Sequence, residues 1–448
     1  MLPLLFFGCK TAEIITEEER NAADLESELN ALFENSDTSG NSFTGFVLHD
    51  PEEAEEIYSF NGGKNFIPAS NAKLFTFYAG LRILPDSIPA LFYTEKSDSL
   101  IFWGTGDPSF LHHDFGSGYV YRFLKSTESK LYFSDTNFND KPLGSGWAWD
   151  DYNYYYSAEK SPFPIFGNVA RFRLAKISET RPLMRDGKYQ VSPEIFGNLI
   201  VNGQKDEKNQ SMIVRDRTGN RFTFHTQTDT IFVDRDVPFH WDQKLFLEIL
   251  ADTLGREVNY QPLELPENAG KIYSLPADTL YRRMLLPSDN FVAEQLLLVM
   301  SAHLFGELNT DRVIDYILEN YLQDLPQKPR WVDGSGLSRY NLFSPRSVVK
   351  VLQLIDQAID DESRLFHLLP ANGKSGTLEN MYTSGDTARP FLFAKTGTLS
   401  NNHSLSGFLV TDSGKKLIFS FMNNNFTDPL PHIQTKMEKV LQVIRSSY

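Results

Sequence analysis

The sequence predicts an α+β fold in which helices flank an antiparallel sheet and a large β-rich module is inserted in mid-chain. Strand-like segments occur near both ends of the 448-residue chain, and the most apolar helical segments lie between them. Between residues 95 and 264 the pattern changes to short strands separated by Asp, Asn, Gly and Pro. We therefore expect a discontinuous main domain, residues 21–94 and 265–448, that carries an inserted β-rich module at residues 95–264.

The N-terminal part of the main domain begins with a helix and a hairpin. Residues 17–35 are rich in Glu and place leucines at helical spacing, which predicts an amphipathic helix. Residues 42–49 and 56–60 alternate between apolar and polar side chains around Asp50-Pro51, which predicts a hairpin. A second helix is expected from residue 70, because an apolar run follows directly.

The C-terminal part of the main domain returns to strands. Residues 391–394 form an apolar run that indicates a buried strand. Residues 404–411 and 416–423 predict a hairpin that turns at residues 412–414, and residues 431–446 predict a closing helix. Because these strands come from the opposite end of the chain, we expect them to pair with the N-terminal hairpin in one sheet.

The inserted module contains short strand-like runs divided by turn residues. These runs are Leu100–Trp103, Lys130–Phe133, Asn198–Val201, Met212–Val214, Phe222–His225 and Thr230–Val233. We find no repeat of fixed period in the chain.

Composition excludes some classes of function. Hydrophobic residues make up 41% of the chain, which is enough for the cores of two or three globular domains. The net charge is −15 and no basic stripe occurs, so we expect no nucleic-acid partner. No motif predicts a cofactor or a metal. The segment His112-His113-Asp114 lacks a second ligand pair at zinc spacing, and we interpret it as a solvated loop.

The only cysteine, Cys9, cannot form an internal disulfide. Residues 1–9 resemble the end of a bacterial lipoprotein signal, in which a small residue precedes the lipidated cysteine. We therefore interpret residues 1–20 as a signal-like segment, Cys9 as the lipidation candidate, and the periplasm or cell envelope as the location. The basic region of a signal peptide is missing, so the alternative is a short apolar terminus.

Ser70-x-x-Lys73, followed by the apolar run from Leu74, is the first sign of catalysis. A helix N-terminus presents unpaired N–H groups and a partial positive charge, which stabilise negative charge on oxygen. A lysine three residues further lies on the same helical face, within reach of the hydroxyl. If that lysine is neutral, it can accept the serine proton.

The S-x-x-K pattern occurs four times, so its context must decide. Only Ser70 precedes both Ser288-Asp289-Asn290 and Lys395-Thr396-Gly397 in the required order with a helix directly after it. These three motifs together are the signature of penicillin-interacting serine enzymes. The pairs that fail on order or context are Ser157/Lys160, Ser347/Lys350 and Ser413/Lys416.

The chain resembles the D-alanyl-D-alanine carboxypeptidase/endopeptidase family, the class C low-molecular-mass penicillin-binding proteins. Beyond the three motifs, the resemblance rests on Gly104-x-Gly106-Asp107-Pro108, on Trp147–Asp151 with Tyr156–Ala158, and on Asp333–Asn341 with Ser344-Pro345. It extends from about residue 40 to residue 425 and implies a transpeptidase/β-lactamase-like domain. A long insertion between the first two motifs is also similar to this family, whereas compact β-lactamases lack it.

The resemblance implies a role for each motif residue. Ser70 would attack the penultimate D-alanine of a peptidoglycan stem peptide while Lys73 accepts its proton. Ser288 would relay a proton to the leaving D-alanine, and Asn290 would orient Lys73 and bind the substrate amide. The implied substrate-binding residues are Lys395, Thr396, Gly397 and Thr398. β-Lactam antibiotics would be covalent inhibitors, with no cofactor.

Asp151 is a further substrate-binding candidate, because the resemblance places it where the insertion approaches the cleft. There it could meet the free amine of a stem-peptide diamino acid, although a turn or helix-cap role is an equal alternative. The neighbouring tyrosines, residues 152–156, could form a carbohydrate or peptide platform. Packing between the insertion and the main domain is our preferred interpretation of them.

Two other classes of protein remain as alternatives. A β-lactamase would share all three motifs, but no E-x-x-L-N segment lies between Ser288 and Lys395 to supply a deacylating glutamate. A non-catalytic wall-binding scaffold could use the same fold, although the intact motifs argue against it. The balance of carboxypeptidase and endopeptidase action, the deacylation base and the oligomeric state stay open at this stage.

Overall fold

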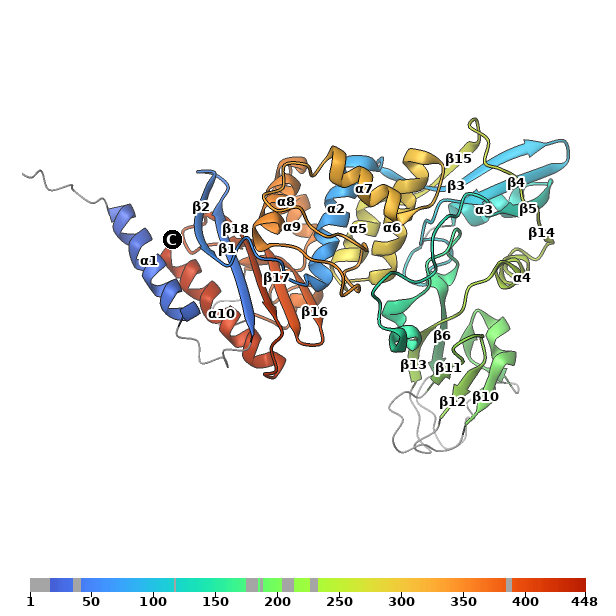
Figure 1. The fold of residues 1–448 in the computed structure, drawn as a ribbon. Coiled ribbons are helices and arrows are strands. Elements are labelled where there is room, and N and C mark those ends of the chain that lie inside the picture. The colour runs from blue at the N-terminus through green and yellow to red at the C-terminus, as the bar shows by residue number, and fades with distance from the viewer. Residues whose placement is uncertain are drawn as a thin grey trace, which may run out of the picture.

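The computed structural model describes residues 17–34, 42–116, 118–174, 184–185, 188–203, 213–225, 233–383 and 389–448. Cys9 and the other residues of the signal-like segment up to residue 16 lie outside the described residues. The main domain and the insertion form the two ends of an elongated molecule (Figure 1).

The main domain is built on a five-stranded antiparallel sheet in the order β16-β17-β18-β1-β2. Its strands are β1 Phe43–Asp50, β2 Glu55–Phe60, β16 Leu392–Leu399, β17 Asn402–Val410 and β18 Lys416–Asn424. Both predicted hairpins are present, and β1 from the N-terminal half pairs with β18 from the C-terminal half (Figure 1). The sheet therefore joins the two ends of the chain, and β16 is one of its edges.

Helices cover both faces of this sheet. They are needed on both, because successive apolar side chains of β1 point to opposite faces. Phe46 and Leu48 face one hydrophobic cluster, which α1 Glu17–Glu34 and α10 Leu430–Ser447 complete. Val47 faces the opposite cluster. The helices on that second face are α2 Ala72–Ile83, α5 Ala277–Leu285, α6 Asn290–Phe305, α7 Thr310–Asn320, α8 Pro345–Ala358 and α9 Glu362–Leu368.

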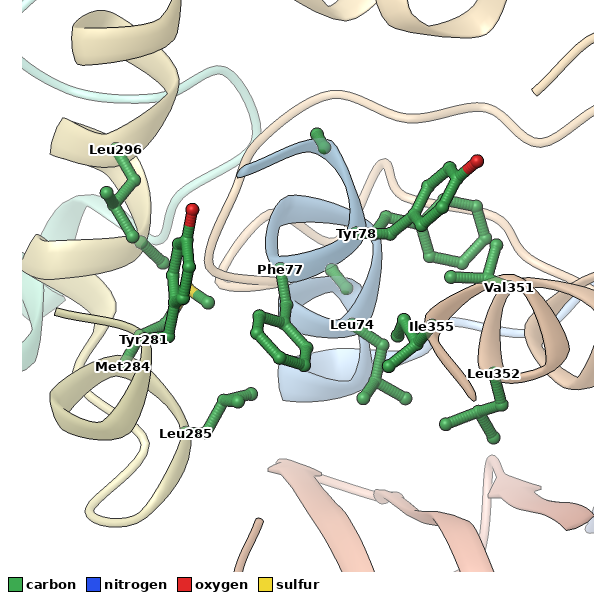
Figure 2. Packing of buried hydrophobic residues seen from close by; sticks show 14 of the residues in the cluster. Leu74, Phe77, Tyr78, Tyr281, Met284, Leu285, Leu296, Val351, Leu352 and Ile355 are labelled. Atoms are coloured by element: carbon green, nitrogen blue, oxygen red, sulfur yellow. The ribbon is translucent and has the colours of Figure 1, made fainter. Parts of the chain in front are cut away.

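Helix α2 is the centre of the second face, because it is buried on nearly all sides. Figure 2 shows Phe77 of α2 facing Tyr281 and Met284 of α5, while Leu74 lies toward Ile355 of α8. The rings of Phe77 and Tyr281 meet edge to face, with centroids 5.2 Å apart. A helix enclosed in this way gives a rigid mount for the residues at its N-terminus.

The insertion contains a second five-stranded sheet, in the order β14-β5-β4-β3-β15. Its strands are β3 Ser87–Lys96, β4 Ser99–Gly104, β5 Lys130–Ser134, β14 Val258–Tyr260 and β15 Gly270–Pro276. Because β3 begins before residue 95 and β15 ends after residue 264, this sheet uses residues on both sides of the predicted insertion. Two helices that the sequence reading overlooked, α3 Tyr119–Ser126 and α4 Gln243–Leu254, pack within the same hydrophobic cluster.

Smaller sheets extend the far end of the insertion (Figure 1). They have the orders β13-β6-β9, β10-β12-β11 and β7-β8. Their strands are β6 Val169–Leu174, β7 Met184–Arg185, β8 Lys188–Tyr189, β9 Val191–Ser192, β10 Ile200–Asn202, β11 Ile213–Arg215, β12 Phe222–Phe224 and β13 Val233–Pro238. Over the described ranges, no helix has both the length and the apolar character needed to span a membrane.

Candidate active site

Ser70 lies in a 3₁₀ turn, Ala69–Asn71, that leads directly into α2. The Nζ of Lys73, one turn later, lies 3.1 Å from the Ser70 Oγ and donates a hydrogen bond to it. Ala69 has a φ of +47°, a conformation that is costly for a residue with a Cβ and persists only where the surroundings impose it. One such neighbour is Gly336, where a Cβ would lie 1.8 Å from the Ala69 carbonyl oxygen. The turn that carries Ser70 is thus tightly enclosed.

Lys73 is completely buried, and its amine has three hydrogen-bond acceptors. Besides Ser70, they are Oδ1 of Asn290 at 2.6 Å and the carbonyl oxygen of Ser335 at 2.7 Å. Burial lowers the pKa of Lys73 to about 8, and the nearby charges of Asp333 and Glu294 oppose this decrease. A lysine with this pKa is partly neutral near physiological pH, as a general base must be.

Asn290 connects Lys73 to the insertion. While its Oδ1 accepts from Lys73, its Nδ2 donates to the main-chain oxygen of Tyr156 at 3.0 Å. Asp289 caps the N-terminus of α6, accepting from the Val292 amide at 3.0 Å, and thereby fixes the start of the helix. Ser288 lies in the preceding loop with a φ of +64° and is partly exposed.

The Lys395-Thr396-Gly397-Thr398 segment lies on edge strand β16 beside the Ser70 turn. A Cβ on Gly397 would lie 2.8 Å from the Ser70 nitrogen and 2.7 Å from the Pro68 oxygen, so only glycine permits this approach. The Asn71 side-chain amide donates to the Lys395 carbonyl oxygen at 2.9 Å and ties the turn to the strand.

Each side chain of this segment has its own partner. The Lys395 Nζ donates to the Thr396 carbonyl oxygen at 2.7 Å. Burial, together with the charge of Lys73, holds the pKa of Lys395 well below its usual value. The Thr396 hydroxyl donates to the Thr377 hydroxyl, and the Thr398 hydroxyl lies 2.9 Å from Nδ1 of His403. No carboxylate pairs with Lys395 within the described part of the chain.

Two buried carboxylates organise the loop that contacts Lys73, and sequence reasoning missed both roles. Asp333 accepts from the amides of Gly336 and Ser338, from Asn341 Nδ2, and from Trp147 Nε1 at 2.8 Å. The Asp-Gly-Ser-Gly-Leu-Ser segment was recognisable, but its hydrogen-bonding partner in the insertion lies 186 residues away. A contact of that range leaves no local pattern in the sequence.

Glu294 is the second of these carboxylates, and it is only 1% exposed. Its Oε1 accepts from the Ser335 amide at 2.8 Å, and the Ser335 carbonyl accepts from Lys73. Its Oε2 has no partner among the described residues. Burial raises the pKa of Glu294 to about 7. A glutamate inside an apolar helical run, four residues after Asn290, was the signal that could have revealed it.

Asp151 lies on a short 3₁₀ turn, Trp149–Asn153, at the edge of the site. It accepts a hydrogen bond from the Tyr156 hydroxyl at 2.9 Å, and the main chain of Tyr156 contacts Asn290. Burial, with this hydrogen bond, raises the pKa of Tyr156. Asp151 is thus connected to Lys73 through two intervening residues. The packing interpretation is wrong for Tyr154 and Tyr155, whose side chains are exposed.

The other S-x-x-K pairs have structural partners. Lys160 pairs with Asp140 at 3.0 Å, and Lys416 pairs with Asp356 at 2.8 Å. The Ser347 hydroxyl donates to the Gln327 main-chain oxygen at 2.7 Å. Among the described residues, only Ser70 and Lys73 form a hydrogen-bonded serine–lysine pair at this spacing.

The His112–Asp114 segment is a loop, as expected from the sequence, but only Asp114 is exposed. His112 is 8% exposed, and burial lowers its pKa to about 4. Asp114 pairs with Arg283 at 2.9 Å and with Arg171 at 3.5 Å, which joins the insertion to α5. In the described ranges, no group of three or more His, Cys, Asp or Glu side chains is placed to bind a metal ion.

The fold and this site define a penicillin-interacting serine enzyme with a large insertion after its nucleophile helix. Residues 25–444 match the D-Ala-D-Ala carboxypeptidase 3 (S13) family. The chain belongs to this family and is a serine-type D-Ala-D-Ala carboxypeptidase, as the motifs predicted.

Relatives match the chain over most of its length. It is 23% identical to D-alanyl-D-alanine carboxypeptidase DacB of Haemophilus influenzae, over 91% of this chain and 90% of the relative. It is 27% identical to the D-alanyl-D-alanine carboxypeptidase of Actinomadura sp. strain R39, over 96% and 86%. Penicillin binding protein 4 (dacB) from Haemophilus influenzae superposes with a TM-score of 0.68 at 21% identity, over 94% and 97% of the two chains. The predicted fold class is therefore confirmed.

Proposed function

We propose that the enzyme acts on peptidoglycan stem peptides through a Ser70 acyl-enzyme. The Ser70 oxygen bonds to the carbonyl carbon of the penultimate D-alanine, and its proton passes to neutral Lys73. The peptide bond then breaks, the terminal D-alanine leaves as an amine, and water later hydrolyses the ester. The observation that carries this mechanism is the buried Lys73 amine, which contacts Ser70, Asn290 and Ser335 together.

The surrounding groups have complementary roles in this mechanism. The amides of Ser70 and Thr398 would bind the tetrahedral oxyanion, because β16 passes directly beside the helix N-terminus. Ser288 would deliver the proton to the departing amine. The terminal carboxylate of the substrate would bind near Lys395, Thr396, Gly397 and Thr398, and would supply the negative partner that Lys395 lacks. Such a carboxylate favours the charged form of Lys395 and so opposes the effect of burial.

β-Lactams imitate the D-alanyl terminus and would acylate the same serine. We expect penicillin to leave one stable penicilloyl group on Ser70, mapped by mass spectrometry of the intact protein and its peptides. Ser70→Ala should remain folded and unmodified. Rapid penicillin hydrolysis without an adduct would instead indicate a β-lactamase, and an adduct that persists in Ser70→Ala would refute this nucleophile.

Asp151 is proposed to bind the free amine of a stem-peptide diamino acid. Its position beside Tyr156, one hydrogen bond from the Asn290 contact, supports this role. Asp151→Asn keeps an acceptor for the Tyr156 hydroxyl but removes the charge. It should raise KM for an amine-bearing peptide and leave turnover of the N-acetylated peptide unchanged. Equal losses on both peptides would assign Asp151 to the turn alone.

We also propose that the enzyme works in the periplasm or cell envelope, with lipid attached to Cys9. The basis is the resemblance of residues 1–9 to a lipoprotein signal, and peptidoglycan lies in that compartment. Membrane fractionation of the full-length gene product, beside Cys9→Ala, tests both points. Recovery of the native protein in the cytoplasm would refute export, and membrane association that survives Cys9→Ala would refute the anchor.

A further inference from the structure

Exposed aromatic side chains gather next to the active site. Trp149 is 68% exposed, Tyr155 is 62%, Tyr340 is 50% and Tyr154 is 44%. We call these four residues the aromatic collar. Large exposed aromatic surface is unusual unless a ligand or partner covers it. The proposed chemistry at Ser70 assigns no role to any of these four rings.

The collar comes from two segments that pack together at the site. The Ser338 hydroxyl donates to the Ser145 main-chain oxygen at 2.6 Å, and the Arg339 amide donates to the Gly146 oxygen at 3.3 Å. Tyr340 follows on the same loop whose Gly336 encloses the Ser70 turn. Tyr155 directly precedes Tyr156, the residue that contacts Asn290. The four rings therefore lie on two segments that contact the Ser70 turn and Asn290.

The rings are held in place although they are exposed. The Arg217 guanidinium lies 4.2 Å from the centre of the Trp149 ring, and that of Arg330 lies 5.3 Å from the Tyr340 ring. Tyr154 stacks on the Tyr156 ring with centroids 5.4 Å apart. Pre-positioned aromatic rings lose little conformational entropy when a ligand binds, so they are efficient contact groups.

We propose that the aromatic collar binds the glycan strand that carries the stem peptides, an inference that rests on the proposed action on peptidoglycan. A sugar ring has apolar C–H faces and a polar edge. Separate aromatic faces with polar hydroxyl or N–H edges, set among Asp150 and Arg217, match that alternation. A hydrophobic protein partner would need a continuous apolar face, and the net charge of −15 disfavours a polyphosphate ligand.

The double variant Trp149→Ala/Tyr340→Ala tests the collar. These residues come from the two separate segments, and Tyr156 is left intact. The matched control is Tyr119→Ala/Tyr273→Ala, which removes two tyrosines that are 56% and 43% exposed on α3 and β15. Tyr119 also lies under an arginine, Arg122, with 4.9 Å between the guanidinium and the ring centre.

Four measurements are made on each full-length protein. Two are co-sedimentation, with purified sacculi and with insoluble glycan from which an amidase has removed the stem peptides. The other two are D-alanine release from a short soluble peptide and penicillin acylation. We expect the collar variant to bind both polymers about tenfold more weakly, as the loss of two aromatic contacts implies. D-Alanine release from the short peptide and penicillin acylation should stay within about twofold of wild type, and the control should match wild type throughout.

The remaining outcomes each overturn the inference. Unchanged polymer binding would exclude a contact with the collar, and an equal loss in the control would show a non-specific effect of surface aromatics. If the wild-type enzyme bound sacculi but not stripped glycan, the collar would contact stem peptide instead. A parallel loss of soluble-peptide turnover would show that the variant disturbs the catalytic site. Failure of the proposed function itself is distinct, since the wild-type enzyme would then release no D-alanine from the short soluble peptide.

Discussion

At the scale of single residues, the proposed mechanism depends on the ionisation of Lys73. Its pKa of about 8 results from burial, opposed by the negative charges of Asp333, Glu294 and Asp289. Lys73 must lose its proton to act as a base, so acylation should increase as the pH rises through about 8. Below that value the protonated amine still donates to its three acceptors but cannot accept the serine proton.

Glu294→Gln tests this electrostatic balance. The Gln oxygen can still accept from the Ser335 amide, but the negative charge that raises the pKa of Lys73 is lost. Glu294 has a pKa of about 7 and is therefore ionised where Lys73 titrates. Removing its charge should lower the pKa of Lys73, so the pH profile of penicillin acylation should shift toward acid. Stopped-flow acylation rates between pH 5 and 10 measure the shift on both proteins.

Glu307→Gln provides the control, because it removes a carboxylate just beyond the opposite end of α6 that pairs with Arg312 at 2.6 Å. Its acylation profile should coincide with that of the wild-type enzyme. A Glu294→Gln profile that also coincides would show that Glu294 only supports the Ser335 peptide. A shift toward alkali would contradict the sign of the coupling.

At the scale of elements, the sequence predicted what local periodicity encodes. The hairpins β1–β2 and β17–β18 and the helices α1, α2 and α10 agree with the structure, because each has its pattern within one contiguous segment. Helices α3 and α4 were missed among the short strands around them. The parallel pairing of β14 with β5 joins residues more than 120 positions apart, and no local pattern encodes it.

The same distinction applies to the site. Ser70 and Lys73 were predictable as a pair because three residues on a helix place both on one face. The contacts of Lys73 with Asn290 and Ser335 span 217 and 262 positions, so they were implied only by resemblance or were not seen at all. Glu294 was hidden because a buried glutamate in an apolar run is identifiable as functional only when its partners are known.

Strand β16 and the Ser70 turn are the two elements whose spacing sets the catalytic geometry. Gly397→Ala would place a Cβ within 3 Å of the Ser70 nitrogen and the Pro68 oxygen, both rigid backbone atoms. The strand and turn must separate, so we expect acylation to fall by about 10- to 100-fold and stability by about 1–3 kcal/mol. Penicillin acylation kinetics and urea unfolding measure the two effects.

Gly116→Ala is the matched control, because a Cβ there meets no atom within 4 Å. It should behave as wild type in both measurements. If penicillin acylated Gly397→Ala at the wild-type rate, the close approach of β16 would not be needed for the reaction. Loss of stability with normal acylation would place the strain elsewhere than at the nucleophile.

At the scale of the whole molecule, the insertion contacts the candidate catalytic site. The Tyr156 main chain contacts Asn290, and Trp147 contacts Asp333. Gln295 of α6 is fully buried. Its side chain accepts from the Ser161 amide and donates to the main-chain oxygens of Ser161 and Gly106. Asn290 and Gln295 lie on consecutive turns of α6, and Asp333 lies on the loop that contacts Lys73. A structural change in the insertion should therefore alter the position of the nucleophile.

Trp147→Phe measures this dependence, because it keeps an aromatic ring but removes the N–H that donates to Asp333. Asp333 is 1% exposed and would lose one of its four donors, which should cost about 1–3 kcal/mol. Its loop carries Ser335, so Lys73 should lose alignment and acylation should slow by about tenfold. Trp103→Phe removes a comparable N–H bond, to the Leu263 oxygen at 2.8 Å inside the insertion.

The comparison of these two variants decides whether the insertion acts on the site or only stabilises the chain. Both should lower the urea midpoint, because each leaves a hydrogen-bond acceptor with one donor fewer. Only Trp147→Phe should slow penicillin acylation measured under native conditions. If both variants slowed it equally, activity would follow overall stability. If neither did, the Asp333 loop would hold Lys73 without help from the insertion, and the long insertion would serve substrate binding alone.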